Sequence, residues 1–453
     1  MNREELEKRV LLYEEEYKRN LYFFSQNKNP LYQFLRIYYF ALYMELFKNF
    51  DLSFVIKELL IKVRRKIRYI KKKPHVGYMI NTLDKGGVEQ VVYNIVTNSK
   101  DSLPYIFIIG GKYGQYGFEL RAKGYYVYLL NENFTYFEEI VEKVPIPLIN
   151  SHYCIWNLDK ISGLGIKIVY TIHSMYRWIV EEKDINNRKE MYKYVTTFFS
   201  VSGKVRDYFS IKFGIEKERI ILVKNGFNSK EYNVKSPIAS DMKDKLFVLE
   251  DKFLFINVGS IVPVKNHLLL LDSFKEHILD NQNSELWFIG AQSERNYYKF
   301  LRQKVKKLDL TNKVKFIKHL NKKELGAVYR RANCFILSSV YEGSPNVLLE
   351  SMFFQIPIIS TDVGNAKELI SEYGIIIPNS YNGLQTIKDV EIEVLPYKMN
   401  QDNKENLVIA MSMIVLDYDY WKKKAVKGKE IINKKYSVKD VVQEYEDNLL
   451  RIF

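Results

Sequence analysis

Short apolar segments recur along residues 75–377, and each is followed by a turn and a helical stretch. When strands alternate with helices, each helix returns the chain to the start of the next strand, so neighbouring strands run parallel. Helices are expected between the strands, for example over residues 268–279 and 297–308. The pattern predicts an α/β protein built on parallel sheets. The segments predicted as strands are 76–81, 105–109, 126–130, 148–150, 166–172, 197–201, 220–223, 253–258, 286–289, 314–317, 334–337, 358–360 and 375–377.

A polar stretch over residues 228–251 interrupts this rhythm, and its Ser236 and Pro237 are typical of a connection between domains. We therefore predict two Rossmann-like domains, one over residues 75–235 and one over 236–453, the second ending in charged helices. The 453 residues are enough for two or three domains at about 150 residues each. Ligands of such sheets bind outside the carboxyl ends of the strands, so a cleft between the domains is the predicted site.

Residues 1–74 are predicted to form a basic helical extension, because they lack the period-2 alternation of strands. They carry 17 basic and 9 acidic residues, which accounts for +8 of the net charge of +15. Eight cations between Lys62 and Lys73 interleave with apolar residues. This pattern fits an anionic lipid surface, where each cation contributes about 1 kcal/mol. A solvated extension packed on the folded core is the alternative.

The cellular location and the partners of the protein are predicted from the absence of targeting, membrane-spanning and nucleic-acid-binding motifs in the sequence. Charged residues precede the first apolar run, which argues against a signal peptide, and the apolar stretch over residues 37–44 is far shorter than the ~20 residues that span a bilayer. Cys154 and Cys334 belong to no Cys/His cluster, which argues against a disulfide framework and structural zinc. We expect a cytoplasmic protein, peripheral at the inner face of the cell membrane. The positive charge lacks any nucleic-acid-binding motif, so no nucleic-acid partner is predicted.

The segment over residues 341–350 (YEGSPNVLLE) follows a predicted strand. Ser344 is a favourable N-cap residue and Pro345 suits a first helical turn, so a helix is predicted to start there. Its N–H groups and the positive end of its dipole form a ready anion site. Glu342 precedes this start and Glu350 lies about two turns into the helix. Two carboxylates beside an anion site suit a ligand with phosphates and hydroxyls, such as a nucleotide sugar. An ordinary helix with surface glutamates is the alternative.

Other candidate residues stand at predicted strand ends. A glycine turn follows the first strand of the second domain, and Lys265 within it is suited to neutralise a phosphate. In the first domain, Gly86 and Gly87 permit close approach of a ligand, although a plain turn explains them equally well. His152 and His173 each follow a strand and are expected to face the cleft, with a structural role as the alternative for both.

Two motifs are set aside. The sequence DYD over residues 417–419 spells the D-x-D of metal-dependent sugar transferases, but it lies in a predicted helix near the C-terminus. The sequence GGK over residues 110–112 lacks the upstream glycine and the Ser/Thr of a P-loop. No metal site and no cofactor are predicted.

Taken together, these residues resemble the retaining nucleotide-sugar glycosyltransferases of family 4, which have the GT-B architecture of two facing Rossmann-like domains. The resemblance covers roughly residues 75–453. Its marks in chain order are Gly86-Gly87, His173, Ser202, Asn225-Gly226, the turn Gly259 to Asn266 with Lys265, the E-x7-E pair Glu342 and Glu350, and the segment Pro357 to Gly364 followed by Glu368.

The resemblance implies roles for these residues. Glu350 would bind the ribose hydroxyls of the donor, Glu342 would contact the donor sugar, and His173 would lie beside that sugar. Gly87, with Gly86, would lie near phosphate or acceptor. The catalytic residues are predicted to be Glu342, Lys265 and His173. The residues expected to bind the donor are Gly259, Ser260, Lys265, Gly343, Ser344, Pro345, Asn346, Val347 and Glu350.

Three positions depart from the family pattern. Ser260 stands where an arginine is usual, so Lys265 and the helix start would carry more of the diphosphate charge. Gln355 replaces a usual glycine, and Asn365 follows Gly364 where a second glycine is common.

We therefore expect a metal-independent, retaining transferase that moves a hexose-type sugar from a nucleoside diphosphate donor. UDP is the first expectation for the nucleotide, and the acceptor is expected to be a glycan or a lipid-linked molecule in the synthesis of cell-surface polysaccharide such as capsule. A non-catalytic GT-B subunit that stabilises a partner transferase is the alternative. The serine at position 260 favours this alternative, and the presence of Glu342, Lys265 and Glu350 disfavours it.

Overall fold

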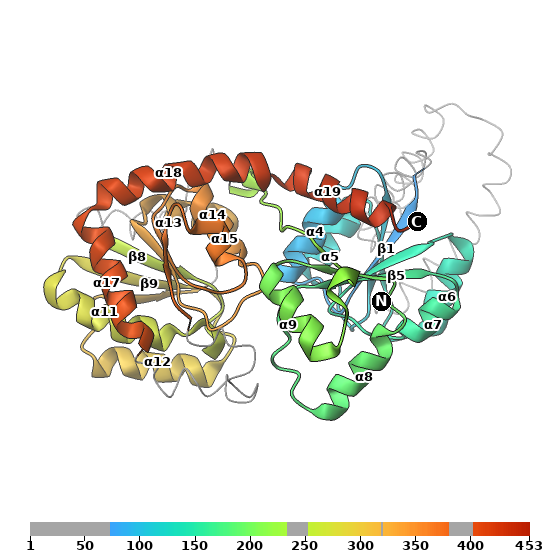
Figure 1. Ribbon diagram of the computed structural model, residues 1–453, viewed down its shortest axis with the longest axis horizontal. Helices are drawn as coiled ribbons and strands as arrows, with labels where there is room; N and C mark the ends of the chain where they lie inside the picture. Colours follow the sequence, from blue (N-terminus) through green and yellow to red (C-terminus); the bar gives the residue numbers. More distant parts are fainter. Residues whose placement is uncertain (1–72, 233–251, 319, 380–401) are drawn as a thin grey trace, which may run out of the picture. The chain divides into compact units, whose positions relative to one another are not determined.

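The computed structural model describes residues 73–232, 252–318, 320–379 and 402–453, which include two parallel sheets, each flanked by helices (Figure 1). The predicted basic extension lies outside the described residues except for its last two. Most of the predicted polar connection lies outside them as well. The helical character of residues 1–74 and their contact with a membrane therefore stay predictions.

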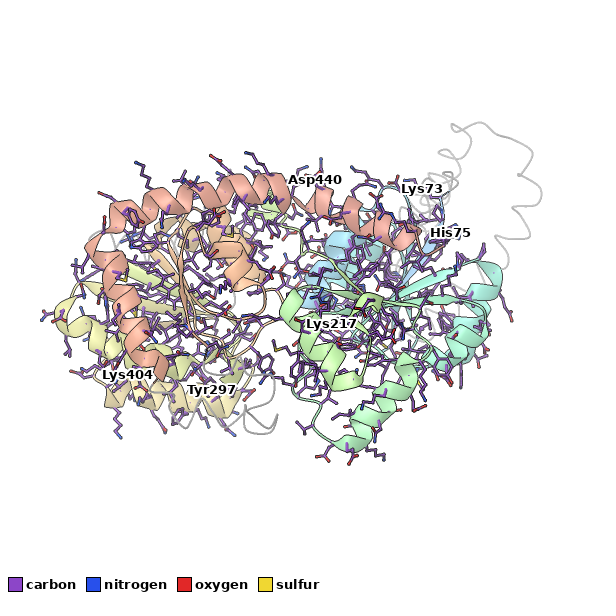
Figure 2. The ribbon with its side chains drawn as sticks, viewed as in Figure 1. Lys73, His75, Lys217, Tyr297, Lys404 and Asp440 are labelled. Carbon is purple, nitrogen blue, oxygen red and sulfur yellow. The ribbon has the colours of Figure 1, made fainter. Side chains whose placement is uncertain are left out.

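The first sheet has the strand order β3-β2-β1-β4-β5-β6-β7, with parallel pairing throughout. The order reverses between β1 and β4, which is the kind of switch point beside which α/β proteins bind ligands. Its strands are β1 (His75–Ile80, with His75 labelled in Figure 2), β2 (Leu103–Ile108), β3 (Tyr126–Leu129), β4 (Leu148–His152), β5 (Lys167–Ile172), β6 (Thr197–Ser200) and β7 (Ile220–Leu222). Its helices are α4 (Gly87–Asn98), α5 (Gly114–Ala122), α6 (Phe134–Lys143), α7 (Leu158–Gly163), α8 (Glu182–Tyr192) and α9 (Gly203–Phe213).

Successive residues of each central strand enter different cores on the two faces of the sheet. In β1, Met79 packs in the core covered by α6, α7, α8 and α9, whereas Tyr78 and Ile80 pack in the core covered by α4 and α5. A strand that is buried on both faces must be apolar at nearly every position. This is why the strands are visible in the sequence as continuous apolar runs.

The second sheet is also parallel and has the order β10-β9-β8-β11-β12-β13. Helices α13, α14, α15 and α18 contribute to the core on one face, and α11, α12 and α17 to the core on the other (Figure 1). Its strands are β8 (Phe253–Val258), β9 (Ser284–Ile289), β10 (Val314–Ile317), β11 (Cys334–Leu337), β12 (Ile358–Thr361) and β13 (Ile375–Ile377). Its helices are α11 (His267–Asp280), α12 (Arg295–Lys307), α13 (Lys322–Arg331), α14 (Asn346–Phe353), α15 (Ala366–Ile370), α17 (Asp402–Leu416) and α18 (Tyr418–Lys435).

Each strand predicted from the sequence is present in these two sheets, and its ends agree with the prediction to about two residues. The α/β fold with two Rossmann-like parallel sheets is thereby confirmed. The helices predicted over residues 268–279 and 297–308 are α11 and α12.

The last helix, α19 (Val438–Leu450), packs on the first sheet, although its residues fall in the range predicted for the second domain. The ring of Tyr445 meets that of Phe199 edge-on with centroids 5.1 Å apart, and its hydroxyl accepts a hydrogen bond from Asn150 at 2.5 Å. The carboxylate of Glu446 accepts the backbone N–H of Ser102 at 2.9 Å. Because α18 packs against α14, the C-terminal helices contact both sheets in turn. The predicted limits of 75–235 and 236–453 therefore separate the two sheets but misplace the last helix.

The DYD segment caps a helix. Asp417 is the N-cap of α18, and its carboxylate accepts the backbone N–H of Tyr420 at 3.3 Å. Over the described ranges, no three or more His, Cys, Asp and Glu side chains gather in a way that could hold a metal ion. Within the same ranges, no helix combines the length and apolar character needed to cross a bilayer.

Gln355, which replaces a usual glycine, ends α14 in the left-handed region with φ of 57°. Its N–H bonds to the carbonyl of Met352, and the N–H of Ile356 bonds to the carbonyl of Ser351. This is the Schellman arrangement, in which glycine is preferred because a Cβ is strained at positive φ. The departure from the family pattern therefore places strain at the end of the helix that carries Glu350.

We predict that Gln355→Gly raises the free energy of unfolding by about 1 kcal/mol. Left-handed backbone costs a residue with a Cβ roughly 1–2 kcal/mol, and the greater freedom of glycine in the unfolded chain offsets part of this gain. Urea denaturation followed by circular dichroism measures the change. The matched control is Gln303→Gly on the exposed side of α12, which should lower stability by about 1 kcal/mol. A loss of stability in the position-355 variant would contradict the prediction.

Candidate active site

The loop between β11 and α14, at the carboxyl end of the second sheet, carries the predicted donor-binding residues Gly343, Ser344 and Pro345. Helix α14 begins at Asn346, with Pro345 as its N-cap and no capping hydrogen bond from a side chain. The predicted cap at Ser344 is therefore wrong by one residue. The side-chain N–H2 of Asn225 donates to the carbonyl oxygen of Ser344 and to the Oδ1 of Asn346, each at 3.1 Å. The Ser344 carbonyl therefore bonds to the side chain of Asn225. The helix begins at Asn346, after the proline.

Two glycines allow three backbone segments to touch beside this loop. A Cβ on Gly343 would lie 1.8 Å from the carbonyl oxygen of His173, and a Cβ on Gly364 would lie 2.3 Å from the carbonyl oxygen of Gly343. Gly364 also has a positive φ of 51°. No side chain fits at either position. His173, at the end of β5, is therefore held directly against the loop that carries Glu342.

Lys265 and Glu342 form an ion pair. Lys265 lies in a short 3-10 turn (Pro263–Lys265) after β8, and its ammonium group contacts the Oε1 of Glu342. The same oxygen accepts the hydroxyl of Ser339 at 2.7 Å, and the hydroxyl of Ser338 holds the carbonyl of Lys265 at 2.8 Å. Both charged side chains are mostly buried, with 23% and 15% exposed. The structure thus brings together two of the predicted catalytic residues, and an anionic ligand would compete with Glu342 for the ammonium group.

Glu350 is buried and held by three donors. Its Oε1 accepts the hydroxyl of Tyr232 at 2.5 Å and the ammonium of Lys322 at 2.9 Å, while its Oε2 accepts the hydroxyl of Tyr329 at 2.7 Å. Burial, followed by the charge of Glu350, raises the pKa of both phenols well above the usual value, so both remain protonated donors. A carboxylate has about four acceptor positions. The three donors therefore leave Glu350 with acceptor capacity on Oε2.

Sequence reasoning missed Tyr232, Lys322 and Tyr329. Lys322 opens α13, and the capping box of that helix, Asn321 with Glu324, marks its start in the sequence. Neither Lys322 nor Tyr232 stands at a motif spacing from Glu350, so the sequence did not connect them. Only the packing of α13 and the segment around Tyr232 against α14 brings the four side chains together.

His152 and His173 form a buried pair. The Nδ1 of His152 lies 2.8 Å from the Nε2 of His173, and burial lowers the pKa of His173 to about 3 and that of His152 well below its usual value. Both rings are therefore neutral, and one must donate to the other. The Nε2 of His152 is buried and has no hydrogen-bond partner. A buried N–H without a partner is the rarer arrangement, which indicates that His152 donates from Nδ1 and that His173 carries its proton on its own Nδ1.

The two histidines, both expected to face the cleft, differ in exposure. His173 is 7% exposed and its backbone lies against Gly343, whereas His152 is fully buried and touches His173 from within the first domain. His152 therefore supports His173 instead of facing a ligand.

The glycine pair of the first domain makes room for an acidic side chain. Gly86 is the N-cap of α4, and a Cβ there would lie 2.1 Å from the Oε2 of Glu89 in the first turn. A Cβ on Gly87 would meet nothing within 4 Å. Burial, with a smaller contribution from Asp84, raises the pKa of Glu89. A carboxylate folded over this helix start disfavours a phosphate there and favours a hydroxyl group.

A lysine on α9 joins the two predicted domains. Lys204 pairs with Asp362, in the loop after β12, at 2.5 Å and donates to the carbonyl of the same residue at 3.1 Å. Ser202 caps the same helix, and its hydroxyl accepts the N–H of Val205 at 3.3 Å. Ser260, where the family usually has arginine, is exposed.

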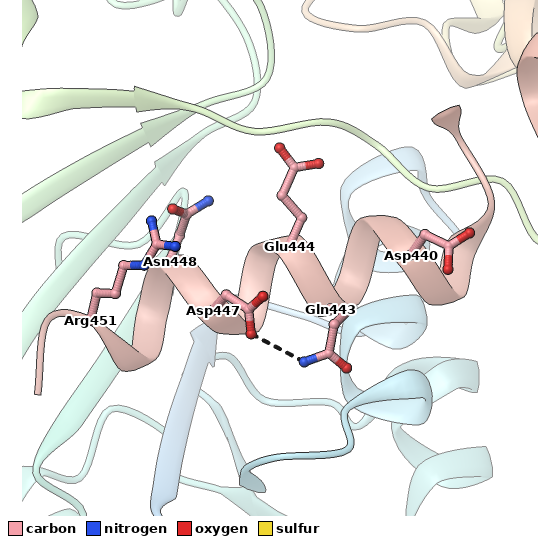
Figure 3. A pocket seen from close by; sticks show the side chains of 6 residues that line it. All are labelled: Asp440, Gln443, Glu444, Asp447, Asn448 and Arg451. Carbon is pink, nitrogen blue, oxygen red and sulfur yellow. Dashed lines mark hydrogen bonds between the residues drawn. The ribbon is translucent and has the colours of Figure 1, made fainter. Parts of the chain in front are cut away.

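A surface hollow elsewhere has none of these features. It has a volume of about 490 Å³ and runs along α19 (Figure 3). Its side chains are all polar or charged and come from one helix, whereas ligand sites are largely apolar and enclosed. None of the predicted site residues lines it. The lining residues are Asp440, Gln443, Glu444, Asp447, Asn448 and Arg451.

Two parallel sheets, a buried glutamate on α14 and a Lys265–Glu342 pair define a protein of the GT-B type. Comparison with family models agrees. The model described as "Glycosyltransferase Family 4" matches residues 74–231, and the model described as "Glycosyl transferases group 1" matches residues 239–388. The chain belongs to the group 1 glycosyltransferases.

Individual relatives are distant. An uncharacterised glycosyltransferase of Methanocaldococcus jannaschii is 24% identical over 49% of this chain and 57% of its own length. The capsular polysaccharide biosynthesis glycosyltransferase CapM of Staphylococcus aureus is 24% identical over 49% of this chain and 54% of its own length. The chain thus spans little more than half of these curated relatives. The HepE protein of Anabaena, solved in complex with UDP-glucose, shares the fold with a TM-score of 0.67 and 16% identity over 83% of this chain and 99% of its own.

We predict that Tyr329→Phe lowers the free energy of unfolding by about 1.5–3 kcal/mol, the usual contribution of a hydrogen bond to a charged group. The variant keeps the ring and removes only the donor to the Oε2 of Glu350. Urea denaturation measures the loss. The control is Tyr298→Phe on α12, where the ring keeps its edge contact with Phe316 and the change should stay within about 0.5 kcal/mol. Equal effects of the two substitutions would contradict the prediction.

Proposed function

We propose that this chain transfers a hexose-type sugar from a nucleoside diphosphate donor to a hydroxyl group of a glycan or lipid-linked acceptor, with retention of anomeric configuration and without a metal ion. The observation that carries the proposal is that Lys265 pairs with Glu342 in the loop before α14, where the backbone of Gly343 lies against His173, while Glu350 is buried on the same helix. UDP is the first candidate nucleotide, since the structural neighbour HepE was solved with UDP-glucose.

Stabilisation of the leaving diphosphate would come from Lys265 and the N–H groups at the start of α14. As the glycosidic bond breaks, negative charge develops on the diphosphate, and preorganised donors lower the energy of that state. The ammonium of Lys265 would then exchange Glu342 for a phosphate oxygen. This exchange frees Glu342 to accept hydroxyls of the donor sugar, while Glu350 holds the ribose.

His173 would act as a neutral hydrogen-bond donor. Its low pKa excludes a cationic role near neutral pH, and the bond from His152 to Nε2 would leave Nδ1–H to donate to a ligand. We propose front-face attack by the acceptor hydroxyl, with the leaving diphosphate helping to take its proton, and we assign no covalent nucleophile. Such a route needs stabilised charge and correct orientation, which are what the described side chains supply.

We predict that Lys265→Ala slows donor turnover by about 10²–10³-fold, as expected for loss of one electrostatic donor. The measurement is release of the nucleoside diphosphate from a panel of nucleotide sugars, first ranked by thermal shift of the wild type. Lys306→Ala on the exposed face of α12 is the control and should turn over donor at the wild-type rate.

If Lys265→Ala and Glu350→Ala both turn over donor at the wild-type rate, the proposal is wrong. A wild type that binds nucleotide sugars but never releases the diphosphate, with or without acceptor, would support the second candidate, a non-catalytic GT-B subunit of a partner transferase. The specific observation behind that candidate is Ser260, which removes one cation from the donor site.

We further propose that the acceptor belongs to cell-surface polysaccharide synthesis and that residues 1–74 dock on an anionic membrane. The relative CapM supports the first statement by its name. The eight cations between Lys62 and Lys73 support the second. The enzyme would then work at the cytoplasmic face of the membrane.

The docking prediction is that the full chain sediments with vesicles containing phosphatidylserine at low salt and is released as the salt concentration rises, because attraction to surface charge falls within a Debye length. A chain starting at Pro74 should remain in the supernatant. Vesicles of phosphatidylcholine alone serve as the control. Unchanged sedimentation after truncation would show that the extension does not carry membrane binding.

A further inference from the structure

Three aromatic rings pack together beside His173. The ring of Tyr153 lies 5.0 Å from that of Tyr176 and 5.8 Å from that of Trp178, and the last two rings are 5.2 Å apart. Tyr176 is fully buried, whereas Trp178 is 49% exposed. The cluster therefore has a rigid base and an open indole, and neither the family match nor the proposed chemistry accounts for that indole.

Two of these residues have strained backbone. Tyr153 has φ of 61° and Tyr176 has φ of 54°. Positive φ in a bulky residue is a true outlier and costs of order 1–3 kcal/mol, and such strain clusters at functional sites. The two tyrosines lie on different loops, one after β4 and one after β5. Both strained residues contribute rings to the same cluster.

The cluster is part of the active-site wall. The ring of Tyr153 lies 5.5 Å from that of His173. In the loop after His173, the guanidinium of Arg177 stacks over the ring of Tyr341, at 5.9 Å, directly before Glu342. Trp178 follows Arg177 in the chain. The exposed indole of Trp178 is therefore linked through the ring of Tyr153 to His173, the residue proposed to contact the donor sugar.

Polar groups surround the aromatic surface. Burial raises the pKa of the Tyr153 hydroxyl, an interaction with the side chain of Ser174 lowers it in part, and Tyr341, Glu89 and Glu342 raise it further. The phenol is thus a protonated donor that lies within electrostatic reach of two carboxylates. An apolar face with a few convergent hydrogen-bonding groups is the usual composition of a site for an amphipathic small ligand.

We propose that Trp178 and Tyr153 form a subsite for one sugar ring of the acceptor, with the C–H face of the ring stacked on the indole and its hydroxyls directed to the polar groups around Tyr153. The inference rests on the proposed function, because the transferase reaction requires an acceptor beside the donor sugar. A nucleobase also stacks on aromatic rings, but the nucleoside end of the donor is assigned to Glu350 on α14. The hydroxyl-rich surroundings of Tyr153 favour a saccharide.

The test uses the full-length chain, fluorescently labelled, on an array of printed oligosaccharides. The wild type should bind a subset of the glycans, and Trp178→Ala should weaken that binding at least tenfold, since a stacked Trp is a typical source of binding free energy. Trp178→Phe keeps an aromatic face and should retain binding within about threefold. The matched control is Tyr194→Ala, which removes an aromatic ring of similar exposure, 43%, at the end of α8 and should bind as the wild type does.

Three results of the glycan-array test would overturn the proposed acceptor subsite. These are a wild type that binds no printed glycan, a Trp178→Ala variant that binds as tightly as the wild type, and competition by free uridine for the binding that depends on Trp178. Thermal unfolding of each variant shows whether it is folded; Trp178→Phe then separates loss of stacking from a local collapse. Stabilisation of the wild type by nucleotide sugars, measured separately, tests the proposed function. Stabilisation without glycan binding would leave the proposed function standing and reject this subsite.

Discussion

The close backbone contact between Gly343 and His173 is the constraint on which the site depends. With no room for a Cβ on Gly343, the loop before α14 lies directly against His173 at the end of β5, and with none on Gly364, the loop after β12 lies against Gly343 in turn. This contact brings Glu342 and Lys265 beside His173 and places the aromatic cluster of Tyr153 and Trp178 in the same wall. A side chain at position 343 would push the loop that carries Glu342 away from His173.

Charge in the candidate active site is arranged in pairs. Lys265 contacts Glu342 and Lys322 contacts Glu350, so both of these cations are balanced by a carboxylate. Partly buried pairs of this kind avoid the high cost of an isolated buried charge. In the proposed function, a diphosphate or a ribose hydroxyl would replace one partner of such a pair. Lys322 is a cation beside Glu350 that the sequence did not reveal.

Local signals predicted the fold well and the site in part. The strands are apolar along their whole length because they are buried on both faces, and this made each of them visible. The E-x7-E pair and Lys265 were found because they follow strand ends at fixed spacing. The predicted cap at Ser344 was wrong because Asn225, more than a hundred residues earlier, bonds to its carbonyl. Tyr232, Lys322 and Tyr329 were missed because their common partner, Glu350, is reached only through packing.

The sequence by itself determined that this chain forms two parallel sheets and which loops carry Lys265 and Glu342, since both depend on the order and spacing of neighbouring residues. Tertiary structure alone decided which of these residues touch. It paired His152 with His173, filled the space at Gly86 with the carboxylate of Glu89, and joined Tyr153 to Trp178. These contacts join segments on different strands and helices, and only the packing of whole elements fixes distances between them.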